Sequence, residues 1–223
     1  GADLTNANLT GVDLSSKDLT GTTLTGVDLS GKDLTDTILT DVNLTNAILT
    51  GADLSNANLI GVDLSGKDLT GTTLAEADLT DTILRGVDLS GKDLSGTILR
   101  GADLSGKDLS GTILAGADLS NANLIDVNLV DANLQNTDLR FTLLVDANLT
   151  NAILTGADLS NAVLTGTILT NVNLENAVLT NAILNCVSNS VCVSTGDELS
   201  GKDLTGKKLV GLDLSGMDIT GTT

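Results

Sequence analysis

Gly1-Ala2-Asp3-Leu4-Thr5-Asn6-Ala7-Asn8-Leu9-Thr10 opens a five-residue repeat that decides the fold of this 223-residue chain. Leucine recurs at every fifth position from Leu4 to Leu184, which makes 37 consecutive leucines. On an α-helix this spacing steps each leucine about 140° around the axis, and on a flat strand it alternates leucines between two faces. The leucines share one core only if the backbone turns after every pentad. The repeat therefore predicts a solenoid in which each pentad forms one wall of a coil.

The other positions of the pentad agree with a wall followed by a corner. The residue two before leucine is mostly small, as at Ala2 and Val12, and should share the interior because residues two apart on an extended wall point the same way. The residue just before leucine is usually Asp or Asn, whose short side chains bond nearby backbone at turns. Two after leucine stands Gly, Asn or Asp, the residue types that accept a tight corner.

This A-(D/N)-L-x-x repeat resembles that of the pentapeptide-repeat proteins, continuously over residues 1–184 and more loosely over 199–219. The resemblance implies an all-β fold, a right-handed quadrilateral β-helix of about eleven coils with four pentads each. The four-sidedness comes from the family, because the spacing alone would also allow three or five walls. We expect a regular β-helix at 1–184, a loop or irregular break at 185–198, and degenerate pentads at 199–223 that continue or cap the solenoid.

The composition argues against catalysis. The chain has no His, no Pro, no Trp, no Tyr and one Phe, which suits a narrow tube filled by leucine. Without His there is no Ser/His/Asp or Cys/His set, and nearly all acidic residues sit at fixed repeat positions. No phosphate-binding glycine loop and no calcium-binding nonapeptide repeat occurs. We therefore expect no catalytic residues, no cofactor-binding residues and no metal ligands, and thus no enzyme.

Cys186 and Cys192 lie in the one break of the leucine run. Either Asn189 and Ser194 are degenerate centres of two ordinary pentads, or the stretch bulges out as a loop closed by a disulfide. The two readings exclude each other, because bridged cysteines need Cα atoms within about 7 Å. We favour the disulfide, which points to an extracytoplasmic location, whether secreted, periplasmic or lumenal. Since the chain begins in phase with the repeat, we also expect it to be a segment of a longer protein.

Lysine is placed unusually. Seven of the eight lysines occupy the position two before leucine, where an unpaired ammonium in an apolar tube would be costly. We expect each lysine to extend out at a corner and pair with a carboxylate. The block Gly-Val-Asp-Leu-Ser-Gly-Lys-Asp-Leu occurs at 26–34, 61–69 and 86–94. Copies offset by 35 and 25 residues should land on different faces of a four-walled coil, which argues against one long face tuned to one ligand.

A candidate contact site lies in the second half of the repeat. Apolar side chains stand there at positions expected to face outward, and together they predict an exposed apolar patch for an unknown protein partner. Phe141 is the one aromatic residue and replaces the usual corner Gly or Asn. The residues of this predicted patch are Ile125, Val130, Phe141, Leu143 and Val145.

Two functions from different classes fit these observations. The first is a non-enzymatic structural or interaction module, a rigid acidic rod that could also self-associate end to end through its open edges. The second, implied by the resemblance, is a DNA mimic that binds a type II topoisomerase, since 29 carboxylates over a rod of roughly 50 Å approach the phosphate density of duplex DNA. Against mimicry, every central residue from 4 to 184 is leucine, where the mimics favour Phe. With a net charge of −18 and no long apolar run, we expect neither nucleic-acid binding nor a membrane span.

Overall fold

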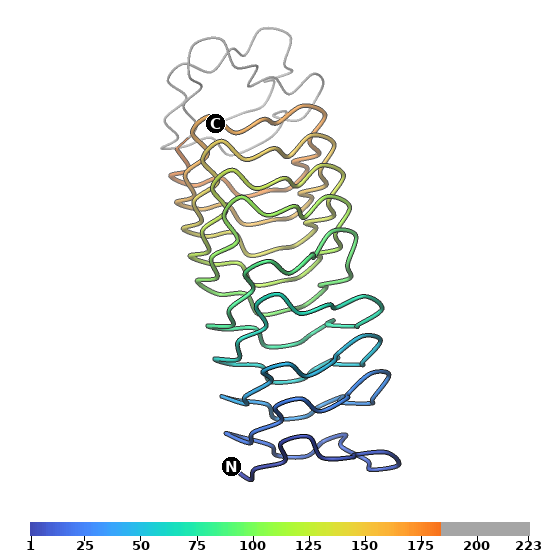
Figure 1. Cartoon of the computed structure of the whole chain (residues 1–223). Helices are drawn as coiled ribbons and strands as arrows, with labels where there is room; N and C mark the ends of the chain where they lie inside the picture. The colour runs from blue at the N-terminus through green and yellow to red at the C-terminus, as the bar shows by residue number, and fades with distance from the viewer. Residues whose placement is uncertain (184–223) are drawn as a thin grey trace, which may run out of the picture.

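A computed structural model describes residues 1–183 as one stack of coils (Figure 1). Within these residues there is no helix and no extended strand, and the backbone pairs through single-residue parallel bridges. Every bridge joins residues 20 apart, from Asp3 with Thr23 to Val163 with Ile183. One coil therefore holds four pentads, and the described residues form about nine coils. The predicted break, the final pentads and both cysteines lie outside the described residues.

The four walls are named here by their leucines. Face A contains Leu4 and every twentieth residue after it, and face B likewise begins at Leu9. Face C begins at Leu14 and face D at Leu19, so faces B and D lie on opposite sides of the tube. Within each pentad we call the residue two before leucine the inner position, the one just before it the outer position, and the one two after it the corner position.

The interior is the leucine column together with the inner positions. Every leucine of the column from Leu24 to Leu179 is buried, while Leu4, Leu9 and Leu19 are partly buried and pack against it. Inner Ala and Val residues are buried beside them. The buried hydroxyls of inner threonines donate hydrogen bonds to main-chain carbonyls, as Thr137 Oγ1 does to Leu114 O at 2.8 Å. The predicted division of the pentad into interior and exterior is confirmed.

The corners are four-residue turns with left-handed backbone. The leucine carbonyl accepts a bond from the amide three residues on, as between Leu4 O and Ala7 N at 2.9 Å. The third residue of such a turn has positive φ, which favours Gly and Asn. Corner residues from Asn6 to Asn181 have φ of 54–62° where they are not glycine. The outer Asp or Asn braces the turn, since Thr5 N donates to Asp3 Oδ1 at 2.9 Å.

Where the ladder is regular, neighbouring coils are joined by two backbone bonds on each wall and a third at the corner, as from Asn136 N to Thr155 O at 2.9 Å. At one such wall, Leu134 N donates to Ile153 O at 2.7 Å, and Ile153 N donates to Ala132 O at 2.9 Å. This ladder is unbroken along the whole of face D, from Asp18 to Val178. The leucines therefore fill the tube, and the amides set the spacing of the coils.

Candidate functional site

The structure brings four residues of the predicted patch together on face A. Leu143 stands at an outer position, with 39% of its surface exposed, and Phe141 at the preceding corner is 54% exposed. Val145 follows on the same wall, and Ile125 holds the equivalent position one coil earlier. Val130 is half-buried on face B, so it does not belong to this group.

Two further residues extend the group, which we call the face A patch: Ile125, Phe141, Leu143, Val145, Val163 and Ile183. Val163 bridges Leu143 from the next coil, and Ile183 bridges Val163 from the coil after that. Reasoning from the sequence missed both, although reading every twentieth residue from Leu143 would have found them. The same outer column carries Asp3, Asp63 and other polar residues in the earlier coils. An outward column that is mostly polar thus becomes apolar over its last coils.

The patch has an acidic border. Asp126 and Asp146 occupy the corners between faces A and B, one coil apart and both exposed. Asp126 N donates to Val145 O at 2.9 Å, which places this corner directly beside the apolar side chains. Within the described residues neither carboxylate forms an ion pair. A partner that fits this surface would present an apolar contact flanked by basic groups.

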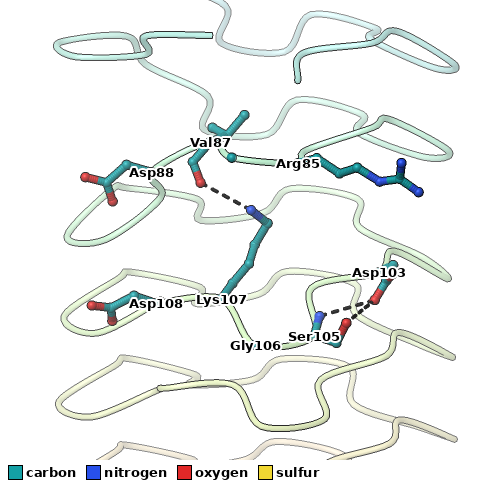
Figure 2. Close-up of a pocket in the computed structure, with 9 residues that line it drawn as sticks. Arg85, Val87, Asp88, Asp103, Ser105, Gly106, Lys107 and Asp108 are labelled. Atoms are coloured by element: carbon teal, nitrogen blue, oxygen red, sulfur yellow. Dashed lines mark hydrogen bonds between the residues drawn. The ribbon is translucent and has the colours of Figure 1, made fainter. Parts of the chain in front are cut away.

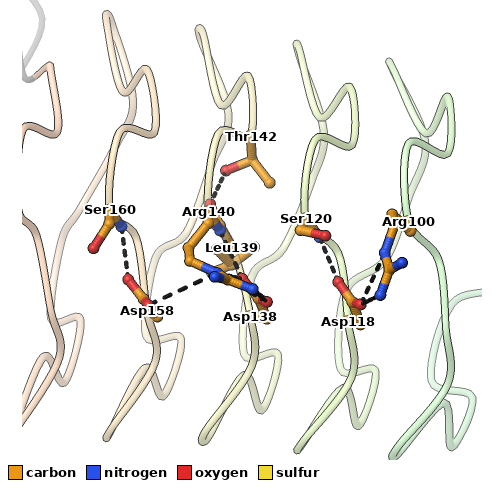
Figure 3. A network of polar contacts seen from close by, with 9 residues as sticks. All are labelled: Arg100, Asp118, Ser120, Asp138, Leu139, Arg140, Thr142, Asp158 and Ser160. Atoms are coloured by element: carbon orange, nitrogen blue, oxygen red, sulfur yellow. Dashed lines mark hydrogen bonds and ion pairs between the residues drawn. The ribbon is translucent and has the colours of Figure 1, made fainter.

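A second polar cluster lies on face D and connects successive coils (Figure 3). Arg100 Nη2 lies 2.6 Å from Asp118 Oδ2, and Arg140 Nη2 lies 2.5 Å from Asp138 Oδ2. Arg140 also reaches toward Asp158, at 3.9 Å. The hydrogen bonds from Arg140 hold the pKa of Asp138 below its usual value. Burial raises the pKa of Asp118, but bonds from Ser120 and Arg100 outweigh that effect and leave it lowered. Because the arginines of these pairs are at least half exposed, the pairs add little stability.

The lysines at inner positions do not pair with carboxylates, so that expectation was wrong. Within the described residues no lysine ammonium lies within 4 Å of a carboxylate, and the ammonium groups donate to main-chain carbonyls instead. Lys107 Nζ donates to Val87 O at 3.2 Å, in the gap between two coils (Figure 2). Lys67 Nζ does the same to Ala47 O at 3.1 Å. Burial lowers the pKa of both ammonium groups. A main-chain carbonyl of the preceding coil lies within reach of each of these two ammonium groups, whereas no carboxylate lies within 4 Å of either.

Clefts open between the coils at these lysines. The cleft at Lys107 has a volume of about 460 Å³ and is bordered by Arg85, Asp88, Asp103 and Asp108 (Figure 2). A cleft of about 680 Å³ lies at Lys92, and one of about 510 Å³ at Lys32. In the part of the chain that the structure describes, no group of three or more His, Cys, Asp or Glu is placed to hold a metal ion. The clefts place one or two lysines near aspartates without an ion pair, and within the described residues they contain no arrangement of nucleophile and base.

Over residues 1–183 no helix is long and apolar enough to cross a bilayer.

Comparison with known proteins identifies the repeat. The family model for pentapeptide repeats matches in 8 copies, at residues 2–41, 37–74, 52–91, 74–106, 102–140 and 142–181. No curated protein matches the chain.

Three solved structures show what the chain is similar to. HetL, a pentapeptide repeat protein involved in heterocyst differentiation regulation from the cyanobacterium Nostoc sp. strain PCC 7120, is 28% identical; the match covers 96% of this chain and 90% of HetL, with a TM-score of 0.33. A trypsin-treated variant of QnrB1, a plasmid-mediated fluoroquinolone resistance protein, is 19% identical over 94% of this chain and 88% of its own, with a TM-score of 0.36. The Nostoc protein alr5209 is 37% identical over 44% of this chain and 71% of its own, with a TM-score of 0.18. On the repeat matches, which span nearly all of residues 2–181, the chain belongs to the pentapeptide-repeat family.

Proposed function

We propose that this chain is a non-enzymatic interaction module, a rigid acidic rod that presents the face A patch to a protein partner. The observation that carries the proposal is Phe141. This residue holds a left-handed corner at φ 61° with its ring more than half exposed, a placement that L-residues with bulky side chains rarely adopt. Neither folding nor packing of the tube calls for an aromatic ring there, since Gly, Asn or Asp fills nearly every other corner.

The charges support a partner of a defined kind. The patch joins apolar side chains to the exposed carboxylates of Asp126 and Asp146, on a chain with a net charge of −18. Basic groups around an apolar contact on the partner would be attracted to this border, and the apolar centre would be desolvated on binding. The partner is therefore expected to be a basic protein surface rather than a nucleic acid.

The test replaces patch residues with residues that the repeat already uses at the same positions. In a Phe141→Asn, Leu143→Asn double variant, Asn is native to both kinds of position, so folding should be retained by circular dichroism and thermal unfolding. The matched control is Ile153→Asn, which removes an exposed apolar side chain from an outer position on face C. Cross-linking in cells of the native source should lose the same protein partner with the patch variant and keep it with the control. Retention of every cross-linked protein by the folded double variant would contradict the proposal.

The proposed rod is also assigned an extracytoplasmic location. This rests on Cys186 and Cys192, which lie outside the described residues, and on the expected disulfide between them. Blocking free thiols in protein from its native source before mass spectrometry would show a linked pair. Two alkylated cysteines would remove the basis for this location. End-to-end self-association of the rod is expected to appear in sedimentation velocity as a mass that grows with concentration.

A second candidate function, mimicry of DNA toward a type II topoisomerase, is favoured by the stacking of carboxylates. Asp118, Asp138 and Asp158 lie one above another on face D, at the spacing of the coils. Arg100 and Arg140 neutralise part of this row, which weakens the likeness to a phosphate backbone. A supercoiling assay distinguishes the two: inhibition at micromolar protein that falls steeply with salt would favour the mimic. Full topoisomerase activity at that protein concentration would argue against mimicry and favour the interaction module.

A further inference from the structure

The ladder between coils is interrupted in a regular way. Within residues 1–183, eight positions lack the bridge to the residue 20 earlier, and all eight are aspartates of a Gly-(Val/Ala)-Asp-Leu-Ser-Gly-Lys-Asp-Leu block. These blocks span 26–34, 61–69, 86–94 and 101–109. Beyond residue 109 every bridge of the described chain is present. The unbridged aspartates are Asp28, Asp33, Asp63, Asp68, Asp88, Asp93, Asp103 and Asp108.

The glycine corners within the blocks have open space around them. A Cβ added at the glycine before each block lysine would meet no atom within 4 Å; these glycines are Gly31, Gly66, Gly91 and Gly106. The same atom added at Gly71 or Gly111 would meet the backbone of the previous coil at 3.5 or 4.0 Å. Gly116, outside the blocks, is open in the same way, so these corners agree with the missing bridges but are not specific to the blocks.

In three of the four blocks the lysine ammonium occupies the place of a missing ladder bond, whereas Lys92 Nζ donates to Leu69 O at 2.6 Å. In the regular ladder, the carbonyl of an inner residue accepts from the outer amide of the next coil, as Lys107 O accepts from Asn128 N at 2.9 Å. At the block, Val87 O accepts from Lys107 Nζ, and Asp108 N makes no ladder bond in the described structure. The side chain of Lys107 therefore separates its coil from the preceding coil. The following coil pairs with it normally, through the bond from Asn128 N to Lys107 O.

The interruptions gather on one side of the rod. Each block is two pentads wide and covers face B together with face A or face C. The blocks thus occupy different pairs of faces, as their offsets predict, but every pair includes face B. Four of the first five bridges along face B are missing, whereas the opposite face D has lost none. The blue and teal coils stand visibly farther apart than the yellow and orange ones (Figure 1).

We propose that residues 1–109 form a one-sided hinge, in which face B opens and closes around the unbroken ladder of face D, and in which the block lysines hold it open. Opening costs less there than elsewhere, because the wall bonds are absent and only corner bonds such as Gly51 N to Thr70 O at 2.8 Å and Gly91 N to Ser110 O at 2.9 Å remain, while face D keeps the coils in register. The coils beyond residue 109 keep all four ladders and form the rigid part of the rod. A rod built this way bends in one plane.

Amide hydrogen exchange of the full chain, read by NMR, tests the hinge within single coils. The amides of Leu69 and Leu89 on face B lack ladder bonds, whereas Leu79 and Leu99 on face D donate to Ile98 O at 2.8 Å and to Asp118 O at 2.7 Å. Leu69 and Leu89 are expected to exchange at least tenfold faster than Leu79 and Leu99. Leu29 is the control on face B itself, since it donates to Ile48 O at 2.9 Å and should be protected. Equal protection of faces B and D would overturn the proposal.

A pair of substitutions tests the lysine directly. Lys107→Val places at this position the residue found one coil later at Val127, and should slow exchange at Leu89 and Asp108 at least tenfold. Ala157→Lys creates a Gly-Lys-Asp-Leu sequence in the rigid part and should speed exchange at Leu139, whose amide donates to Asp158 O at 2.8 Å. Ala157→Val is its uncharged control and should leave Leu139 protected. If Lys107→Val folds and leaves Leu89 exchanging as before, the lysine does not hold the cleft open and the proposal fails.

Discussion

Leu134→Ala is the sharpest test of the tube, because Leu134 lies wholly inside it with intact ladders on both sides. The side chain is 0% exposed, and the walls are held by Leu134 N to Ile153 O at 2.7 Å and Asn133 N to Thr112 O at 2.9 Å. Removing three carbon atoms forfeits about 2.4 kcal/mol of transfer free energy, at about 0.8 kcal/mol per buried CH₂. Since walls fixed by hydrogen bonds cannot collapse around the void, a cavity term of about 1 kcal/mol adds to this. The expected loss is therefore about 3–4 kcal/mol.

The measurement is urea unfolding followed by circular dichroism, with Leu4→Ala as the matched control. Leu4 belongs to the same column but is only partly buried in the first described coil, so its loss should stay below about 1 kcal/mol. An unchanged dependence of the unfolding free energy on urea would show that both variants unfold as the parent does. Equal losses at the two positions, or a loss below about 1 kcal/mol at Leu134, would refute a packed one-dimensional solenoid.

Three further outcomes are expected. Hydrogen bonds from the Thr73 hydroxyl, the Ser55 hydroxyl and the Ser55 amide lower the pKa of Asp53, so its ionised form stabilises the fold above the unfolded value of about 3.9 and this stability is lost as pH falls through the lower folded value. Urea midpoints should fall between about pH 5 and pH 2, and less steeply in Asp53→Asn; a midpoint that rises on acidification would contradict this. Arg140→Gln should cost less than about 1 kcal/mol and nothing in 1 M salt, because the arginine of its pair with Asp138 is half exposed; a larger loss that persists in salt would contradict this. Phe141→Asn relieves a bulky residue at φ 61° and should not lower the melting temperature in differential scanning calorimetry; a clear decrease would mean that the ring packs against the tube.

The pentad itself could be read from the sequence. Leucine at every fifth residue fixes the core, and the small residue at Ala52 or Val62 is buried where the two-residue spacing placed it. The corner types were also predictable, because a left-handed residue favours Gly, Asn and Asp. The number of walls was not, since the local spacing is the same for three, four or five. That number appears only when the coil closes and Asp3 meets Thr23.

What the sequence alone did not reveal depends on that closure. Val163 and Ile183 join the patch only because the coil is 20 residues long, so no local pattern marks them. The lysines were expected to seek carboxylates, yet Lys67 and Lys107 bind carbonyls that stacking leaves within reach. The common side of the blocks was hidden for the same reason, since only the closure of the coil at 20 residues brings one pentad of every block onto face B. Properties of the pentad are local, whereas contacts between coils need the number of walls.

The left-handed corners provide attachment points at regular intervals along the rod. Corner residues contribute little to the core, and four of them occur in each coil, one at each edge of the tube. A peptide grafted at a corner would therefore have a height set in steps of about 4.8 Å by the coil and a direction set in quarter turns by the edge. Two grafts at Asn136 and Asn176 would project from the same edge two coils apart, while grafts at Asn136 and Asp146 would project from opposite edges. Distance along the rod and direction around it can therefore be chosen separately, because the five-residue pentad sets the edge and the 20-residue coil sets the height.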